Sequence, residues 1–242
     1  MIFKALAALV IVGLLSACSA APGPVILTKP QPGQDGLERD GTKPLSASQA
    51  ARNFVQVVRT VESVAESECR SRTFGVNCDF IIVVDDRRGQ SANAYQTLDR
   101  SGRPVLAFTL GLIADARNPD EMAFVMSHEA SHHILGHIAR QQQNAIAGAV
   151  IAGSVAVLLG GAQADIETAK RSGAELGART YSKDFELEAD ALGTVITARA
   201  GYDPIRGSEF FRRIPDPGDR FLGTHPPNAQ RLEIVRRTAA GL

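Results

Sequence analysis

The chain has 242 residues, of which 44% are apolar, 21% are charged and none is tryptophan. Twenty-six basic residues balance 26 acidic ones, so the formal net charge is zero. The length is enough for one substantial domain, and the charge balance gives no argument for nucleic acid as a partner.

The N-terminal segment has the pattern of an export signal. Lys4 precedes an apolar run over residues 5–15, and small residues follow at 16–17. A short positive region, an apolar region of about ten residues and small residues before a cleavage point are typical of a secretory signal. The run is too short for a comfortable membrane span. We therefore expect residues 1–18 to be a signal peptide.

The end of this signal, Leu-Ser-Ala-Cys, resembles that of bacterial lipoproteins, in which the cysteine is acylated and becomes the mature N-terminus. This implies Cys18 as the lipid anchor, and Ser19 after it favours the outer membrane. An ordinary signal peptide or an N-terminal anchor helix is the alternative. Residues 19–44 are rich in proline and glycine and indicate a flexible tether, so a domain over 45–242 should work close to the membrane surface.

Two further cysteines, Cys69 and Cys78, stand at the front of this domain. Exported proteins meet an oxidising compartment, which favours a disulfide between them. Zinc ligation by the pair is the alternative, although eight intervening residues do not match the usual ligand spacing.

Helix and strand patterns alternate ahead of the central motif. Apolar residues recur at helical spacing over 46–68, with Ser46 or Ser48 as the cap. Strands are expected at 80–84, which reads as buried, at 92–95 and at 104–110. A strand beside a catalytic helix can hold an extended peptide through main-chain hydrogen bonds.

The next helix carries the most informative motif, His128-Glu129-x-x-His132. Asn118 is a good N-cap, and Pro119 suits the first turn. Residues four apart share a helix face, so the two imidazoles can bind one zinc ion while Glu129 takes a proton from water on that ion. The alternative is an accidental match, but four of the five histidines in the chain lie between 128 and 137.

Two further histidines follow this motif. The metzincin pattern requires glycine at 135 and histidine at 138, where this chain has leucine and isoleucine. On a continuous helix His137 lies about 140° from His132 and points elsewhere. We therefore expect His133 and His137 to have structural or supporting roles.

An apolar stretch rich in glycine and alanine follows at 145–159. It is shorter than a membrane span. It is interpreted as a packed helical segment, with a surface that dips into the membrane interface as the alternative. Residues 163–178 carry charges of both signs and read as a solvated helix.

The third metal ligand is expected in a later helix. Glu186 and Asp190 are four residues apart and share a face, so Glu186 can complete a His₂Glu site while Asp190 accepts the second ring N–H of a ligand histidine. Glu188 lies about 200° from Glu186 and should not share that site. A merely charged helix face is the alternative, although acids are costly to bury unpaired in so apolar a helix.

The motifs together resemble one family. His-Glu-x-x-His followed by Arg-x-Tyr-Ser-Lys-x-x-Glu-x-x-Ala-Asp is similar to the HtpX-like zinc metallopeptidases, the gluzincin family of the CAAX prenyl endopeptidases. The likeness extends over about residues 50–236, including the Thr-His-Pro-Pro run at 224–227. Without multiple clear membrane spans, the chain resembles the exported BepA- and LoiP-like branch. The resemblance implies His128, His132 and Glu186 as zinc ligands and Glu129 as general base.

The C-terminal part adds two candidates before and within a final helix at about 228–238. His225 can donate a hydrogen bond to an oxyanion, occupy the fourth zinc position, or merely shape a proline turn. Arg231 can stabilise the oxyanion or pair with an acid. The residues leave these alternatives open.

We thus expect an α+β, mostly helical, zincin-like metallopeptidase domain with a small β-sheet beside the active-site helix. Its function would be that of a zinc endopeptidase of the bacterial cell envelope, with one Zn²⁺ per chain, acting on unfolded or misassembled proteins. We also expect the chain to be attached to the membrane through its N-terminal lipid. We expect no nucleic acid as a partner. The alternative is a non-catalytic or autoinhibited zinc-binding lipoprotein that acts as a chaperone or assembly factor.

Overall fold

The computed structural model describes residues 44–180, 182–218 and 225–242. The predicted signal, Cys18 and all of the tether but its last residue lie outside these ranges. The elements are α1 (Ala47–Arg72), β1 (Ile81–Asp85), β2 (Ala94–Leu98), β3 (Pro104–Thr109), α2 (Leu110–Asp115), α3 (Pro119–Ile134), α4 (His137–Leu158), α5 (Gln163–Thr180), α6 (Ser182–Arg199), α7 (Pro204–Ser208), η1 (Glu209–Arg212) and α8 (Asn228–Ala239). Within the described residues, no helix combines the length and apolar character needed to cross a membrane.

The first helix begins where the sequence predicts. Ser46 forms a reciprocal capping box with Gln49, which satisfies two backbone donors at the start of α1. Val57 and Val61 on its inner face are fully buried. The disulfide between Cys69 and Cys78 is also present, with the two Cα atoms 5.7 Å apart, and it closes the loop from α1 toward β1.

The sheet has the order β1-β3-β2. β1 runs parallel to β3, and β2 runs antiparallel to it. The expectation of a buried first strand is wrong, because Val83 and Val84 are 36% and 43% exposed. β1 lies at one edge of the sheet, so part of its surface faces solvent.

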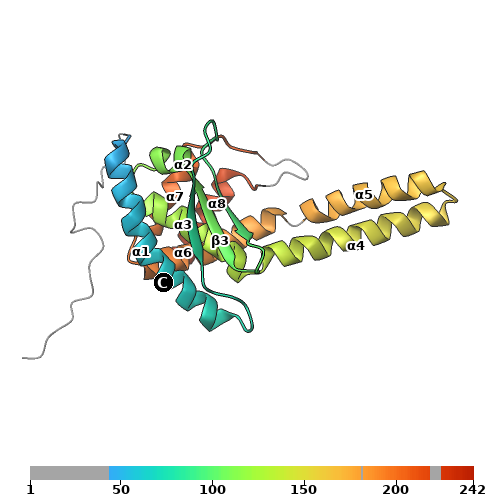
Figure 1. Cartoon of the computed structure of the whole chain (residues 1–242), viewed down its shortest axis with the longest axis horizontal. Coiled ribbons are helices and arrows are strands. Elements are labelled where there is room, and N and C mark those ends of the chain that lie inside the picture. Colours follow the sequence, from blue (N-terminus) through green and yellow to red (C-terminus); the bar gives the residue numbers. More distant parts are fainter. Residues whose placement is uncertain (1–43, 181, 219–224) are drawn as a thin grey trace, which may run out of the picture. The chain divides into compact units, whose positions relative to one another are not determined.

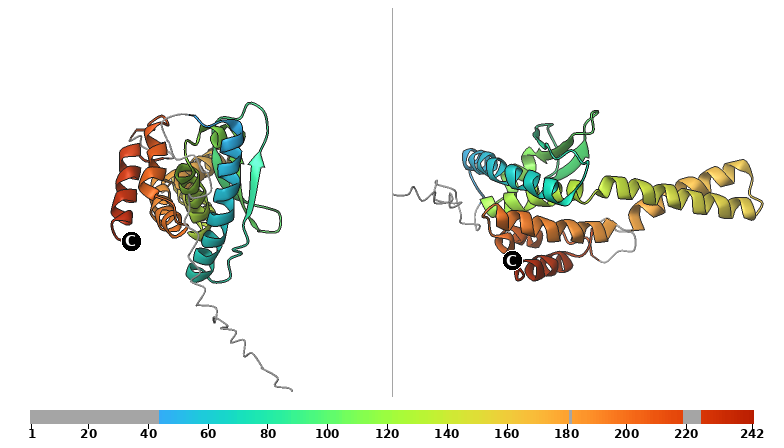
Figure 2. Two further views of the ribbon diagram at one scale, coloured as in Figure 1. Left: turned by 90° about the vertical axis from the view of Figure 1, so that its left-hand side faces the viewer. Right: turned by 90° about the horizontal axis from the view of Figure 1, so that it is seen from below.

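Helix α3 is the central element, and it packs against α1, α6, α7 and β2 (Figures 1 and 2). Its apolar residues Ala123, Met126 and Ala130 are fully buried, which explains the apolar run around the motif. Behind it α6 packs on α8, and α7 and η1 follow the break at residues 201–203.

Helices α4 and α5 form an antiparallel hairpin that extends away from the other elements of the domain (Figures 1 and 2). The predicted helical packing of residues 145–159 is confirmed, since this segment packs along α5. The two helices are not buried in the domain, however. The large apolar side chains of α4 point outward and are exposed, whereas Gly148, Ala152 and Gly153 face α5.

Candidate metal centre

The motif helix is fixed at its N-terminus by its own sequence. The Asn118 side chain accepts a hydrogen bond of 2.9 Å from the backbone N–H of Glu121, and Pro119 occupies the first turn. Both features were predicted. The helix then presents His128 and His132 one turn apart, with their Nε2 atoms 3.0 Å from each other.

Helix α6 brings Glu186 to these histidines. Its carboxylate oxygens lie 3.5 Å from His128 Nε2 and 3.3 Å from His132 Nε2. The close approach of the two helices depends on Gly193, where an added Cβ would lie 3.1 Å from the backbone nitrogen of His128. His128, His132 and Glu186 form the one group of potential ligands found among the described residues.

Asp190 and Arg231 fix the orientation of His128. Asp190 Oδ1 lies 2.9 Å from His128 Nδ1, and because a carboxylate only accepts, this nitrogen carries the proton. Arg231 forms a bidentate pair with Asp190, with both distances 2.7 Å, and its guanidinium lies over the Phe211 ring. All of this is buried.

A second chain of contacts fixes His132. His137 Nδ1 lies 2.8 Å from His132 Nδ1, and His137 Nε2 lies 3.2 Å from Glu188. Glu188 in turn pairs with Arg140. Since Glu188 only accepts, His137 Nε2 carries the proton and its Nδ1 accepts from His132. Burial, together with the charge of His132, lowers the pKa of His137 to about 4, consistent with this neutral form.

The expectation that His137 points away from His132 is therefore wrong. That prediction assumed one continuous helix, but α3 ends at Ile134 and Gly136 adopts φ of +66°. This left-handed residue starts α4 in a new direction and turns His137 back toward His132. A supporting role, which was also expected, agrees with the contacts.

The two proton assignments leave three lone-pair donors facing one another. Both Nε2 atoms and the Glu186 carboxylate converge, and in the neutral form of each imidazole none of the three carries a proton. Two ligands about 2.0 Å from one ion at a tetrahedral angle lie about 3.3 Å apart, which matches the 3.0, 3.5 and 3.3 Å observed. Two imidazoles and one carboxylate are also a donor set of catalytic zinc. The residues fit a zinc ion.

The electrostatics of the metal-free site point the same way. Burial lowers the pKa of His128, but Asp190 and Glu186 outweigh it and raise this pKa to about 10. Burial likewise raises the pKa of Glu186, while the hydrogen bonds from His128, His132 and His225 hold it well below its usual value. The two carboxylates thus favour a positive charge at the position of the imidazoles, and a bound metal ion can supply it in place of the His128 proton.

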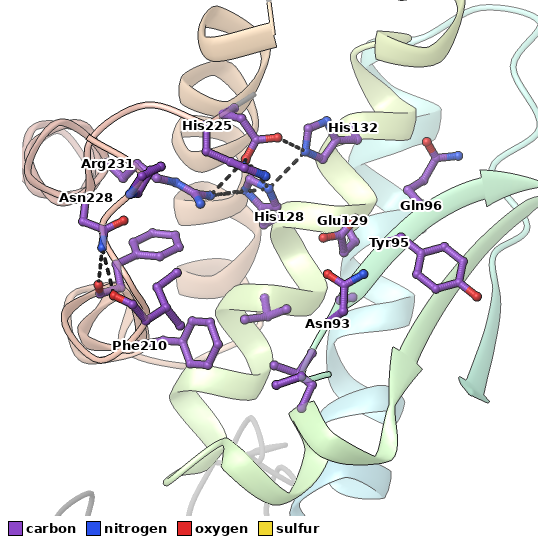
Figure 3. A pocket seen from close by; sticks show the side chains of 18 of the residues that line it. Asn93, Tyr95, Gln96, His128, Glu129, His132, Phe210, His225, Asn228 and Arg231 are labelled. Carbon is purple, nitrogen blue, oxygen red and sulfur yellow. Dashed lines mark hydrogen bonds and ion pairs between the residues drawn. The ribbon is translucent and has the colours of Figure 1, made fainter. Parts of the chain in front are cut away.

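A pocket of about 820 Å³ opens beside these residues (Figure 3). Glu129 lines it next to His128, together with Asn93 and Tyr95 from the sheet. Glu129 is only 9% exposed. Among the described residues β2 pairs only with β3, so its other edge is open. Ala94, Tyr95 and Gln96 of β2 line the pocket.

His225 and Arg231 also line the pocket. His225 Nδ1 lies 3.1 Å from a Glu186 oxygen, and its side chain is half exposed. Arg231 was expected either to stabilise an oxyanion or to pair with an acid. In the structure it pairs with Asp190. His133 lies elsewhere, with its Nε2 2.7 Å from the Asn77 carbonyl oxygen.

Three contributors were missed by sequence reasoning: Arg140, Glu188 in its contact with His137, and Gly193. A glycine inside an otherwise apolar helix, three residues after Asp190, was the available signal of a close helix contact. For Arg140 and Glu188 the sequence offers no signal, because their meeting depends on where α4 starts.

Comparison with known proteins gives a family for this geometry. Residues 51–239 match the model of peptidase family M48. Among curated proteins, the beta-barrel assembly-enhancing protease of Escherichia coli O157:H7 is 32% identical over 135 residues, which cover 50% of this chain and 28% of that protein. The protein of the same name from Yersinia pestis is 29% identical over 135 residues, with the same shares.

A more distant relative is the mitochondrial metalloendopeptidase OMA1 of Arabidopsis thaliana, 27% identical over 135 residues, or 54% of this chain and 27% of that protein. The chain thus spans less than a third of the length of the relatives it matches.

Proposed function

The chain belongs to peptidase family M48, a family of metallopeptidases, and on this premise we propose that it is a zinc-dependent endopeptidase of the bacterial cell envelope. The observation that carries the proposal is the convergence of His128, His132 and Glu186 beside Glu129 in one pocket. A structural zinc site has four protein ligands, whereas a catalytic site has three and an open position.

In this proposal His128, His132 and Glu186 hold one zinc ion per chain. When bound, the ion polarises a peptide carbonyl and lowers the pKa of a water in its open position to around 7. Asp190 and His137 each accept the second ring proton of a ligand histidine and keep both Nε2 atoms free for the metal.

Glu129 acts as general base and then as general acid. It takes a proton from the attacking water and delivers it to the amine that leaves. Its carboxylate is buried at the pocket wall beside His128. His225 on the pocket lining is the proposed hydrogen-bond donor to the oxyanion, whereas Arg231 is already engaged by Asp190.

The open edge of β2 supports cleavage of extended chains. The edge of β2 away from β3 has no strand partner within the described part of the chain, borders the pocket, and can hold a substrate as an additional strand. Such binding requires a locally unfolded polypeptide. We therefore propose unfolded or misassembled proteins as substrates.

Two further observations support a location in the cell envelope. The sequence predicts a lipoprotein signal with Cys18 as anchor, and the relatives from E. coli O157:H7 and Y. pestis are named for beta-barrel assembly. We therefore propose lipid attachment at the periplasmic face of the envelope, in the outer membrane, and a role in protein quality control.

The test compares the zinc-loaded chain with its Glu129→Gln variant on an unfolded protein such as casein. Cleavage by the parent and none by the variant, at equal zinc content, is the expected result. Retained turnover in the variant would overturn the role of Glu129. No cleavage by either protein would favour a non-catalytic chaperone or assembly factor.

The contact of His225 with Glu186 favours one second candidate, a self-inhibited peptidase. In this state His225 sits 3.1 Å from a ligand oxygen and limits access to the metal. The His225→Ala variant distinguishes the two roles of this residue. Faster casein cleavage than the parent indicates inhibition, and slower cleavage indicates that His225 stabilises the oxyanion.

A further inference from the structure

The hairpin of α4 and α5 is held together by small residues. An added Cβ on Gly148 would lie 2.0 Å from the carbonyl oxygen of Gly173, and one on Gly177 would lie 2.1 Å from that of Asn144. The two backbones thus approach too closely for even alanine at these positions. Glycine and alanine occupy this inner face of α4, so the hairpin needs no large side chains in its own interior.

The large side chains of α4 lie on the opposite, outer face. At 100° per residue, those within α4 spread over about one half of the helix circumference, and the last of them stand where α4 ends at Leu158. We define the outer face by its exposed members: Ile146 (65%), Val150 (61%), Ile151 (65%), Val155 (49%), Val157 (57%), Leu158 (85%) and Leu159 (81%). A contiguous apolar surface of this kind marks a site of interaction.

Charge is distributed unequally over the hairpin. No charged residue occurs from 141 to 164, whereas α5 carries six: Asp165, Glu167, Lys170, Arg171, Glu175 and Arg179. One helix is thus apolar on its outer face and the other is polar. The charges of α5 make it unfavourable for the whole hairpin to insert across a bilayer. An apolar environment can therefore contact the hairpin only on the α4 side, at the outer face.

We propose that the outer face lies in the interfacial region of a lipid bilayer, with α4 along the membrane and α5 toward the water. Aliphatic side chains without charge suit the boundary of the acyl chains. The α4 helix, at 22 residues, is about 33 Å long. The hairpin would therefore orient the domain relative to the membrane plane.

The predicted anchor supports the bilayer over other apolar partners. Between Cys18 and the first described residues stand the residues of the tether, 19–44, and a flexible chain of that length spans about 28 Å on average. An acylated Cys18 thus keeps the domain close to lipid. The apolar contact of the hairpin would add to this attachment.

The chain contains no tryptophan, so a single introduced tryptophan reports its own surroundings. Leu158→Trp and Ile151→Trp place the probe on the outer face, and Thr168→Trp places it on the exposed side of α5 as a matched control. Each full chain is reconstituted into vesicles of phosphatidylethanolamine and phosphatidylglycerol with or without bromine on the acyl chains. The Glu129→Gln background separates the result from peptidase activity.

The expected result is a blue shift and a loss of emission in brominated vesicles for Leu158→Trp and Ile151→Trp, with neither for Thr168→Trp. Adding Val150→Glu and Val155→Glu to the Leu158→Trp chain should abolish both signals. Vesicle-bound protein without quenching of the outer-face probes would overturn the proposal. So would a blue shift that occurs without lipid and disappears on dilution, because this indicates a second copy on the outer face.

Discussion

His137 Nδ1 lies 2.8 Å from His132 Nδ1 although the two residues belong to different helices. The contact gives His132 the same kind of support that Asp190 gives to His128. Two separate chains of contacts therefore fix His128 and His132, one through Arg231 and one through Arg140. Each can be tested on its own.

Replacing His137 with leucine should weaken zinc binding by about 10- to 100-fold, the usual cost of losing a partner of a ligand histidine. Competition with a chromogenic chelator measures this. The matched control is His133→Leu, which removes the neighbouring imidazole that contacts Asn77 instead. Equal zinc affinity in the two variants would contradict a positioning role for His137.

The proximity of His128, His132 and Glu186 could be predicted because it depends on spacing within helices, while their roles as metal ligands stay predictions. His128, His132, Glu186 and Asp190 all lie on uninterrupted helical turns, so their angular relations follow from 3.6 residues per turn. The prediction failed for His137 because the left-handed conformation of Gly136 redirects the chain. Whether a glycine adopts this conformation depends on the packing of both helices, which no local pattern contains.

The same distinction applies to the fold. Helix starts at Ser46 and Asn118 were predicted because capping is a local interaction. The exposure of Val83 was not predicted, because an apolar run alone does not reveal which strand lies at the edge of a sheet. The exposed outer face of α4 was missed for a similar reason.

Zinc binding should release protons near neutral pH. The pKa of His128, about 10 in the metal-free protein, means that this residue is protonated at pH 7 and must lose its proton to bind metal. The apparent association constant should therefore rise about tenfold per pH unit through neutrality. Calorimetry in buffers of different ionisation enthalpy measures the release.

The control for this prediction is Asp190→Asn, which removes one of the two carboxylates that raise the pKa of His128 and should reduce the proton release. In the metal-free protein the raised pKa stabilises the fold below about pH 6.5, and this contribution is lost as the pH rises through about 10. An association constant that levels off above pH 7 would show an ordinary histidine pKa.

Glu186→Ala should abolish stable zinc retention. The carboxylate is the only ligand from α6 within the group, and two imidazoles alone leave the metal open to exchange. Zinc content after dialysis should fall from about one per chain toward zero. Asp184→Ala, an exposed acid on the same helix, should retain zinc, and retention by both variants would refute Glu186 as a ligand.

Gly193 controls the distance between the two ligand-bearing helices. An added Cβ lies 3.1 Å from the His128 nitrogen, so alanine requires a small separation of α6 from α3 and valine a larger one. Zinc affinity and melting temperature should fall in the order glycine, alanine, valine. Valine at Gly241, where a Cβ would lie 3.6 Å from its nearest neighbour, should change neither. A valine variant at 193 with parental affinity would disprove the dependence.

Arg231→Leu should be among the most destabilising single changes in the domain. Asp190 is fully buried and Arg231 is 6% exposed, so removing the guanidinium leaves a buried carboxylate without its cation, which costs about 3–5 kcal/mol. Urea unfolding of the metal-free protein measures the loss. Arg236→Leu on the same helix breaks an exposed pair with Glu233 and should cost less than about 1 kcal/mol.

If the buried pair is responsible, adding Asp190→Asn to Arg231→Leu should recover part of the stability, because the neutral amide needs no cation. A double variant as unstable as the sum of both single changes would instead assign the loss to the packing of Arg231 on Phe211.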